Sequence, residues 1–329
     1  MPGIVTAPRG SFAPMLALPA RSLPVGEGWV YEPKWDGFRC LAYAEDGEVD
    51  LRSRHGKPLA ACFPEVVDAL AALPEGFALD GEVLAGPGGE PEFGALMARL
   101  HPAAAHAERL RAQTPAWYVA FDLLVAGGEN VSALPFAERR ARLVALLDGA
   151  DVVVTPSTTD PEVASRWLTE PVGGALDGVI AKRAEMPYQP GKRVMVKVKR
   201  ERTADCVVAG MRVAEGPAVS SLLLGLWSGE SLVHAGVVHA FGRPERVRLV
   251  EELAPFVVPL AGHPWEDGLP AENARWLPGP VPDWVPLRPV LVAEVAYSQA
   301  DGARFRHPAR LVRWRPDRVA ASCTVDQLA

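Results

Sequence analysis

The sequence predicts an α+β protein of two domains, the first rich in antiparallel sheet and the second mostly β. The chain has 329 residues, about twice the length of an average domain. Strand-like and helix-like patterns alternate over its first two-thirds, whereas strand patterns dominate after a crowded run of charge at residues 197–202. We therefore expect domains at residues 1–201 and 202–329.

In the first domain, apolar alternation predicts strands at residues 29–33, 38–44 and 48–53. The turn pairs Asp36-Gly37 and Asp46-Gly47 separate them, so we expect an antiparallel meander. Helical periodicity covers residues 63–73 and 135–147, and the second of these has Pro135 at its start and Gly149 after its end. Further short strands are expected at residues 77–84, 117–125, 151–155, 178–181 and 194–199.

The second domain shows five short strand patterns and one helix. The strands are expected at residues 205–213, 221–227, 232–239, 290–298 and 311–315, and the helix at residues 244–253. Five strands with one helix suit a small β-barrel of the OB-fold type. Residues 255–289, rich in Pro, Gly and Trp, are expected to form a long ordered loop.

Composition indicates a soluble, cytoplasmic protein, which we expect to be a monomer. No apolar run reaches membrane-spanning length, so no membrane contact is expected, and the four cysteines lack metal-ligand spacing. The net charge of −6 argues against a general affinity for nucleic acid. Residues 192–202 and 304–318 are nevertheless basic, and form either solvated faces or a groove that neutralises phosphates.

Lysine is scarce in this chain. The six lysines are Lys34, Lys57, Lys182, Lys192, Lys197 and Lys199. Lys34 lies at a predicted strand end in the octapeptide EPKWDGFR, where the following turn would expose its amine. A lysine amine can act as a nucleophile once neighbouring cations lower its pKa from about 10.4. The alternative is an ordinary hairpin that carries a surface lysine.

The octapeptide resembles motif I of the covalent nucleotidyltransferases, which include ATP-dependent DNA ligases, RNA ligases and mRNA capping enzymes. In that superfamily the motif lysine attacks the α-phosphate of a nucleotide. Sequences similar to the remaining motifs follow in the family's order: SRHGK (53–57), LDGE (79–82), FDLL (121–124), LDGVIAK (176–182), VKVK (196–199) and RWRPDR (313–318). Each could be an ordinary turn or strand by itself, but every lysine except Lys192 falls inside one of them.

The resemblance implies an ATP-grasp-like adenylation domain with a defined set of site residues. Lys34 is the implied catalytic nucleophile. Glu32 would help select adenine, Arg39 would contact the ribose and Phe121 would stack on the base. The implied phosphate contacts are Arg54, Arg193, Lys197, Lys199 and Arg315, the last facing the leaving pyrophosphate. Glu82 and Asp177 would bind Mg²⁺, with Mn²⁺ as the alternative, and Glu82 would also reach the ribose.

Two positions depart from the family pattern. Asp177 stands where the superfamily usually has Glu, and this shorter carboxylate should move the metal or add a water molecule. Arg318 stands where the last motif usually ends in Lys, which keeps the charge but changes its geometry.

Four further segments resemble the small bacterial ATP-dependent DNA ligases of the ligase C type: PMLA (14–17), RTADCVV (202–208), LVAEVAYSQ (291–299) and FRHP (305–308). This resemblance implies ATP-driven sealing of nicks or short repaired gaps in duplex DNA, with a repair polymerase as a candidate partner. It also implies a hinge near residues 201–204. The alternatives are a capping guanylyltransferase, an RNA ligase, and a catalytically silent DNA-binding module.

Overall fold

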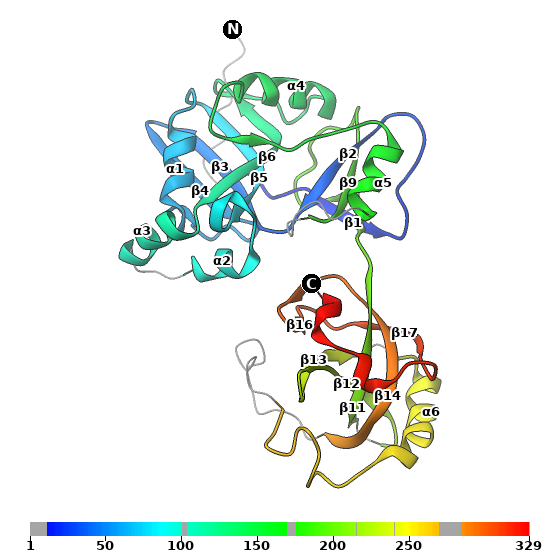
Figure 1. Cartoon of the computed structure of the whole chain (residues 1–329). Helices are drawn as coiled ribbons and strands as arrows, with labels where there is room; N and C mark the ends of the chain where they lie inside the picture. Colours follow the sequence, from blue (N-terminus) through cyan, green and yellow to red (C-terminus); the bar gives the residue numbers. More distant parts are fainter. Residues whose placement is uncertain are drawn as a thin grey trace. The chain divides into compact units, whose positions relative to one another are not determined.

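The computed structural model describes residues 12–100, 104–169, 176–214, 216–239, 241–269 and 284–328. The chain forms two compact units, Met1–Arg200 and Glu201–Ala329 (Figure 1). Within the described residues, no helix is long and apolar enough to cross a membrane.

Two sheets form the first unit. The six-stranded sheet has the order β4 (Glu48–Ser53), β3 (Phe38–Glu45), β5 (Phe77–Ala85), β6 (Ala116–Ala126) and β7 (Glu129–Asn130), with β8 (Val153–Val154) pairing with β6. The four-stranded sheet has the order β1 (Leu16–Ala20), β10 (Arg193–Lys199), β9 (Leu176–Arg183) and β2 (Trp29–Trp35). Apart from the parallel pairs β1–β10 and β6–β8, the pairing is antiparallel, as the sequence predicts.

Five helices lie around these sheets: α1 (Pro64–Ala71), α2 (Phe93–Ala98), α3 (Ala104–Gln113), α4 (Phe136–Leu146) and α5 (Pro161–Thr169). Helix α4 packs on β6 and buries Phe136, Arg139 and Leu143, which share one helical face because of their spacing. Helices α1 and α4 confirm the helices predicted at residues 63–73 and 135–147. Helix α5 packs on β9 and β2.

The predicted meander is wrong at its first step. Strand β2 pairs with β9, about 145 residues later, and not with β3, so the Asp36-Gly37 turn carries the chain from one sheet to the other. A Cβ atom at Gly37 would lie 2.3 Å from the carbonyl oxygen of Val83, which leaves room only for glycine. Strands β3 and β4 do form the expected hairpin.

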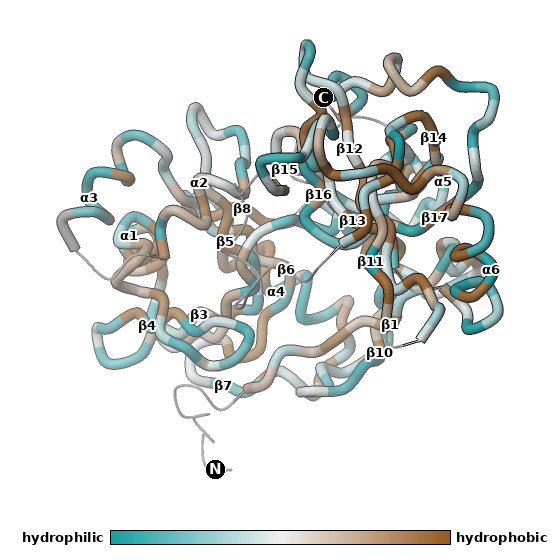
Figure 2. Tube along the Cα trace, turned by 90° about the horizontal axis from the view of Figure 1, so that it is seen from below, coloured by the Kyte–Doolittle hydropathy of each residue, from teal (hydrophilic) through white to brown (hydrophobic). Residues whose placement is uncertain are grey.

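Several elements have no counterpart in the sequence prediction, namely β1, α2, α3, α5 and the two-residue strands β7, β15 and β16. Strand β1 contains Pro19, which disfavours a central strand, but β1 lies at the edge of its sheet, where proline is tolerated. Figure 2 shows apolar residues concentrated on sheet strands such as β5 and hydrophilic residues along α6.

The second unit is a five-stranded antiparallel sheet of OB type with the order β13 (Ser231–Val238), β12 (Val219–Ser228), β11 (Arg202–Val213), β14 (Val285–Tyr297) and β17 (Arg310–Trp314). An isolated backbone bridge links Val238 of β13 to Ala309, the residue before β17. Helix α6 (Arg243–Leu253) packs on β12, and the pair β15 (Ala300–Asp301) and β16 (Arg304–Phe305) lies beside β13.

The predicted loop at residues 255–289 differs from the structure at its end. Strand β14 begins at Val285, five residues before the predicted strand, although Pro286 and Pro289 argued against a strand there. Part of this stretch, residues 270–283, lies outside the described residues. Trp265, within the described part, is fully buried and its indole Nε1–H donates to the carbonyl oxygen of Leu232.

Candidate active site

Lys34 lies near the end of β2, in contact with a buried carboxylate of the neighbouring strand. Its Nζ is 2.5 Å from Oδ2 of Asp177 on β9, and the lysine side chain is 23% exposed. Lys199 of β10 approaches the same oxygen from the other side, at 3.1 Å. The lysine of the first motif therefore lies beside the residues of the fourth and fifth, as the family resemblance implies.

Gly178 explains how β9 brings these side chains together. It pairs with Lys34 of β2 on one side and with Lys199 of β10 on the other. Its φ is +150°, and a Cβ atom there would lie 2.1 Å from the carbonyl oxygen of Val198. Glycine lets the two backbones approach closely, so both lysines reach the carboxylate of the preceding residue, Asp177.

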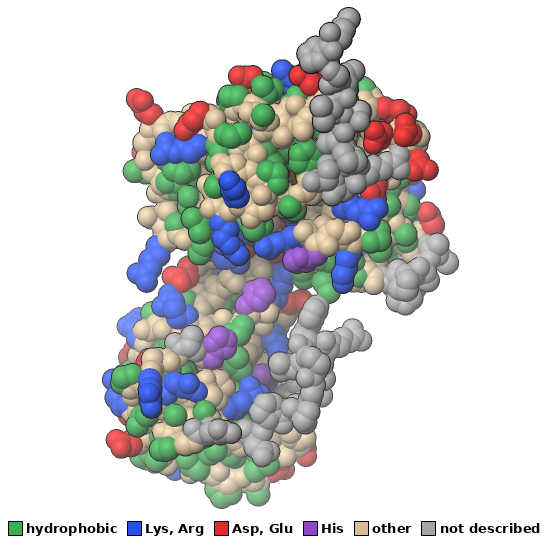
Figure 3. All heavy atoms as spheres, turned by 180° about the vertical axis from the view of Figure 1, so that it is seen from behind, with side chains coloured by type: hydrophobic (Ala, Val, Ile, Leu, Met, Phe, Trp, Pro, Cys, Tyr) green, Lys and Arg blue, Asp and Glu red, His purple; other side chains and the backbone are tan. Residues whose placement is uncertain are grey.

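Cationic side chains, Lys34 among them, act on the amine of Lys197. Burial lowers the pKa of Lys197, and the positive charges of four neighbours lower it further: Lys199, Lys34, Arg54 and Arg193. Residues from three motifs, together with Arg193 at the start of β10, thus share one electrostatic neighbourhood. In the view of Figure 3, Lys and Arg side chains gather along the lower edge of the first unit. Such a cluster suits a polyphosphate.

The side chain of Glu82, on β5, contacts the Asp36-Gly37 turn, where the chain passes from one sheet of the first unit to the other. Its Oε1 accepts a hydrogen bond from the backbone N–H of Gly37, at 3.2 Å. Burial raises the pKa of Glu82 to about 7, although the positive charges of Arg39 and Lys34 oppose that shift. A carboxylate in this state binds a proton or a cation readily.

Arg39 is fixed in the six-stranded sheet by a bidentate ion pair. Its Nε and Nη2 each lie 2.6 Å from an oxygen of the buried Asp80, and its guanidinium lies 4.7 Å from the centre of the Phe121 ring. Tyr188 donates its hydroxyl to the same carboxylate at 2.6 Å and accepts the backbone N–H of Met15. This network orients the predicted ribose contact against the predicted base-stacking ring.

Glu32 is buried and paired with two cations. Its Oε2 lies 2.7 Å from Nζ of Lys182 and its Oε1 lies 2.9 Å from Nη1 of Arg140. Burial raises the pKa of Glu32, and the charges of Lys182 and Arg140 oppose that rise. Lys182 Nζ also donates to the carbonyl oxygen of Phe121 at 3.0 Å, which connects Glu32 to the aromatic ring.

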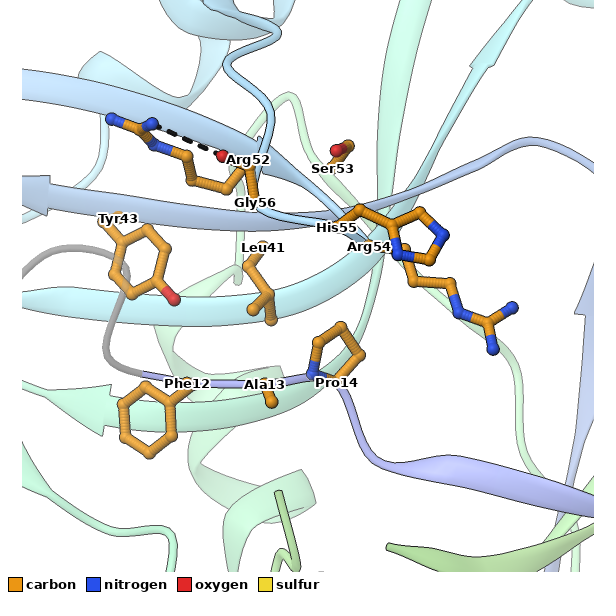
Figure 4. A pocket seen from close by; sticks show the side chains of 10 residues that line it. All are labelled: Phe12, Ala13, Pro14, Leu41, Tyr43, Arg52, Ser53, Arg54, His55 and Gly56. Atoms are coloured by element: carbon orange, nitrogen blue, oxygen red, sulfur yellow. Dashed lines mark hydrogen bonds between the residues drawn. The ribbon is translucent and has the colours of Figure 1, made fainter. Parts of the chain in front are cut away.

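A cavity of about 400 Å³ lies beside the turn that carries Arg54 (Figure 4). Its walls come from the segment before β1, from β3, and from the end of β4 with its following turn: Phe12, Ala13, Pro14, Leu41, Tyr43, Arg52, Ser53, Arg54, His55 and Gly56. Phe12 and Tyr43 give it an aromatic side, and the Arg54 side chain extends away from that pair.

The donor set beside Lys34 fits a magnesium ion completed by phosphates and water. Oδ1 of Asp177 is buried and has no hydrogen-bond partner among the described residues, so it can accept a further ligand. Mg²⁺ commonly uses one or two protein carboxylates together with substrate phosphates. Within the described ranges, no cluster of three or more His, Cys, Asp or Glu side chains could hold a metal ion without such further ligands.

Arg315 belongs to the second unit. Its Nη1 lies 3.0 Å from Oδ1 of Asp205 and its Nη2 lies 2.8 Å from Oδ2 of Asp317. Arg318 contacts the same Asp205 carboxylate at 3.1 Å. The structure therefore pairs the arginines of the last motif with acidic residues of their own unit.

Sequence reasoning missed the residues that hold these side chains in place, namely Asp80, Arg140, Lys182 and Tyr188. Asp80 and Lys182 lie inside recognised motifs, where a role could have been considered. Arg140 lies 108 residues from Glu32 and Tyr188 lies 108 residues from Asp80, so no local pattern could have paired them.

Comparisons with known proteins agree with this geometry. The family described as "ATP dependent DNA ligase domain" matches residues 14–199, and "ATP dependent DNA ligase C terminal region" matches residues 215–318. The chain is 44% identical to DNA ligase C of Mycobacterium tuberculosis, over 96% of this chain and 93% of that protein. It is 45% identical to DNA ligase C2 of Mycolicibacterium smegmatis, over 96% and 94%.

Among solved structures, the ligase domain of M. tuberculosis LigD is similar with a TM-score of 0.51 and 30% identity, over 95% of this chain and 98% of that domain. Mycobacterial DNA ligase D complexed with ATP and MES gives a TM-score of 0.51 and 31% identity, with the same coverage. Both matched family regions, the relatives and the cluster around Lys34 lead to one conclusion: this chain belongs to the ATP-dependent DNA ligases.

Proposed function

We propose that this ligase seals nicks or short repaired gaps in duplex DNA through an adenylate carried on Lys34. The observation that supports this most directly is the position of the Lys34 amine, 2.5 Å from the buried Asp177 carboxylate and among the cations that surround Lys197. A nucleophile at a site that attracts phosphates is what nucleotidyl transfer requires.

In the first step, Lys34 Nζ attacks the α-phosphorus of ATP. The ammonium group first releases a proton to water, and the Asp177 carboxylate in contact with Nζ orients the amine. The Nζ–P bond forms, the bond from the α-phosphorus to the bridging oxygen breaks, and pyrophosphate leaves. Lys197 and Lys199 point to the same side of β10, because residues i and i+2 share a face, and both can neutralise phosphate charge.

The next two steps transfer AMP and then release it. An oxygen of the 5′-phosphate at the nick attacks the adenylate phosphorus, and the Nζ–P bond breaks. The 3′-hydroxyl then loses its proton and attacks the activated 5′-phosphorus, so that the phosphodiester forms and AMP leaves. The same cationic cluster serves all three steps, since each one moves negative charge on phosphate oxygens.

A magnesium ion, with Mn²⁺ as the alternative, would be held by Asp177 and Glu82 and would stabilise the charge on the α-phosphate. Asp177 is shorter than the family's usual Glu, but its free Oδ1 remains available. Arg54 and Arg193 are proposed as further phosphate contacts and Phe121 as the base-stacking ring.

At the level of domains, we propose that residues 1–201 form the adenylation domain and residues 202–329 the OB-fold domain, joined by a hinge near residues 201–204. Arg315 would orient the leaving pyrophosphate, for which it must exchange Asp205 and Asp317 for phosphate oxygens. We further propose that the protein acts as a monomer in the cytoplasm, in repair and recombination, with a repair polymerase as a partner.

Labelling with α-³²P nucleotides tests the nucleophile. With ATP and Mg²⁺, wild-type protein and the control Lys192→Ala should become labelled on a denaturing gel, whereas Lys34→Ala should not. Lys192 is the matched control, since it is the one lysine of the sequence outside the motifs. A chase with nicked DNA should discharge the label and yield sealed product.

Other outcomes would select the alternatives. Label from GTP in place of ATP would indicate a capping guanylyltransferase, and discharge on nicked RNA in preference to nicked DNA would indicate an RNA ligase. Absence of label with either metal would contradict the proposal and favour a DNA-binding protein without catalysis.

A further inference from the structure

The buried carboxylate of Glu32 is paired with two cations that come from different elements of the first unit. Its side chain is only 3% exposed, and each of its oxygens contacts a different cation, Lys182 at 2.7 Å and Arg140 at 2.9 Å. A buried carboxylate needs hydrogen-bond donors at both of its oxygens, and here both donors are cations, one of which is Arg140 of helix α4.

Arg140 does not belong to any motif of the family resemblance. It comes from helix α4, and its Nη2 donates to the carbonyl oxygen of Thr155 at 2.6 Å, while Nη1 donates to Glu32. Thr155 in turn accepts the indole Nε1–H of Trp35, the residue after the nucleophile. Arg140 therefore connects helix α4 with Thr155, directly with Glu32 and, through Thr155, with Trp35. Glu32 and Trp35 lie on either side of Lys34 in β2.

The position of Glu32 relates it to the base-binding side of the site. Glu32 and Lys34 are two residues apart on β2, so their side chains point to the same face. Lys182 contacts Glu32, donates to the Phe121 carbonyl oxygen and lies 5.0 Å from the centre of the Phe121 ring. A base stacked on Phe121 would thus turn an edge toward the Glu32 carboxylate.

We infer that Arg140 is a positioning residue that sets the base specificity of this ligase, by holding Glu32 as an ionised carboxylate that only accepts hydrogen bonds. Such a group attracts the exocyclic amine of adenine, a donor, and repels the O6 atom of guanine, an acceptor. The inference rests on the proposed function, because it assumes that the nucleotide base binds beside Phe121.

Loss of Arg140 should weaken this discrimination. Burial and the negative charge of Asp122 raise the pKa of Glu32, whereas Lys182 and Arg140 lower it, so removal of Arg140 raises this pKa further. A protonated Glu32 has a hydroxyl that can donate to guanine O6. We expect Arg140→Met to lower the ratio of kcat/KM for ATP to that for GTP by about tenfold, mainly through KM.

The pH dependence separates this role from a merely structural one. Acidification from about pH 8 to about pH 6 protonates Glu32 more readily in Arg140→Met than in wild type, because its pKa is higher in the variant. The ATP-to-GTP ratio of the variant should therefore fall more steeply with decreasing pH than the wild-type ratio. Arg140→Lys keeps a positive charge beside Glu32, so this variant should retain most of the discrimination between ATP and GTP.

Two controls accompany the measurement, which follows formation of labelled protein from each nucleotide. Arg142→Met alters an exposed arginine of the same helix, paired only with the exposed Glu129 in the described structure, and should leave the ratio unchanged. Glu32→Gln should lose discrimination like Arg140→Met, and adding Arg140→Met to Glu32→Gln should cause no further loss. Thermal unfolding of each variant monitors folding.

The outcomes are distinguishable. If Glu32→Gln and Arg140→Met both keep the wild-type ratio, or if their effects simply add, the inference is wrong while the labelling of Lys34 stands. If Arg140→Met fails to fold, Arg140→Lys and Glu32→Gln still decide, because retained discrimination in Glu32→Gln overturns the inference. If wild-type protein forms no adenylate at all, the proposed function fails first.

Discussion

At the scale of single residues, the second unit contains a buried histidine, His234, whose pKa is far below its usual value. His234 of β13 is 5% exposed, its ring lies 5.6 Å from that of Trp265, and its Nε2 has no hydrogen-bond partner among the described residues. Burial lowers its pKa to about 3, and the charges of Arg304 and Arg212 act in the same direction. This histidine is therefore neutral in the folded protein at neutral pH.

His234 should make the second unit sensitive to acid. Its folded pKa lies below the unfolded value of 6.5, so the unfolded chain binds more protons between about pH 3 and 6.5, and the free energy of unfolding falls as the pH falls. At pH 4 the loss from this residue should reach about 3 kcal/mol. His234→Phe should remove most of it, as measured by urea unfolding at pH 7 and pH 4. An equal loss in both proteins would contradict this assignment.

The sequence predicts those site residues that lie inside recognisable motifs, but it does not predict the distant side chains that hold them in place. Lys34, Asp177 and Lys199 belong to three separate motifs, and the structure brings them onto one carboxylate. The partners that hold the predicted Glu32 in place, Lys182 and Arg140, were not predicted. A partner supplied from a helix more than one hundred residues away leaves no periodic signal, because tertiary packing alone selects it.

At the scale of elements, the short connection between β2 and β3 places the strand of Lys34 in a different sheet from the strand that follows it. Sequence rules favoured a hairpin, since Asp-Gly is a strong turn signal and both flanking stretches alternate. Strand pairing over long separations cannot be deduced from such local signals. Most of the longer strands follow the predicted ranges, whereas β1 and the two-residue strands β7, β15 and β16 were missed, because apolar alternation is readable only over several residues.

Gly37 should be intolerant of substitution. In Gly37→Ala the new Cβ would meet the Val83 carbonyl oxygen at 2.3 Å and Cγ of Glu82 at 2.8 Å, so the crossing must shift. We expect a cost of about 1–3 kcal/mol in stability and a larger loss of adenylate formation, since Lys34 and Glu82 both move. Thermal unfolding and labelling from α-³²P ATP measure the two effects.

Gly94→Ala provides the matched control for this change. Gly94 lies in helix α2, and a Cβ there would approach only Oε1 of Glu92, at an ordinary 3.7 Å. Alanine favours a helix over glycine, so this variant should be as stable as wild type or more so. Equal behaviour of the two variants would show that the close approach at Gly37 is unimportant.

At the scale of the whole molecule, a protein with a negative net charge must bind DNA, which is also negatively charged. The net charge is −6, yet basic side chains are clustered around Lys197 in the first unit and on β17 in the second. Long-range attraction to DNA should thus be modest, and affinity should come from close contacts between arginine or lysine and phosphate. Such contacts release counterions when they form.

Binding of nicked DNA should consequently weaken steeply with salt. The logarithm of the association constant should fall linearly with the logarithm of salt concentration, with a slope of about −0.9 for each phosphate neutralised. Fluorescence anisotropy with Lys34→Ala between about 50 and 200 mM salt measures binding without turnover. An association constant that does not change with salt would exclude a basic contact surface.

The pairing of β2 with β9 also bears on how the protein is made. The strand that carries Lys34 leaves the ribosome about 145 residues before the strand that completes its sheet, since Lys34 pairs with Gly178. During that interval an apolar strand stays unpaired, and contacts so distant in sequence form slowly. The proposed nucleophile thus acquires its carboxylate partner only when residues 176–199 have emerged, so a truncated nascent chain carries Lys34 without the side chains that contact it.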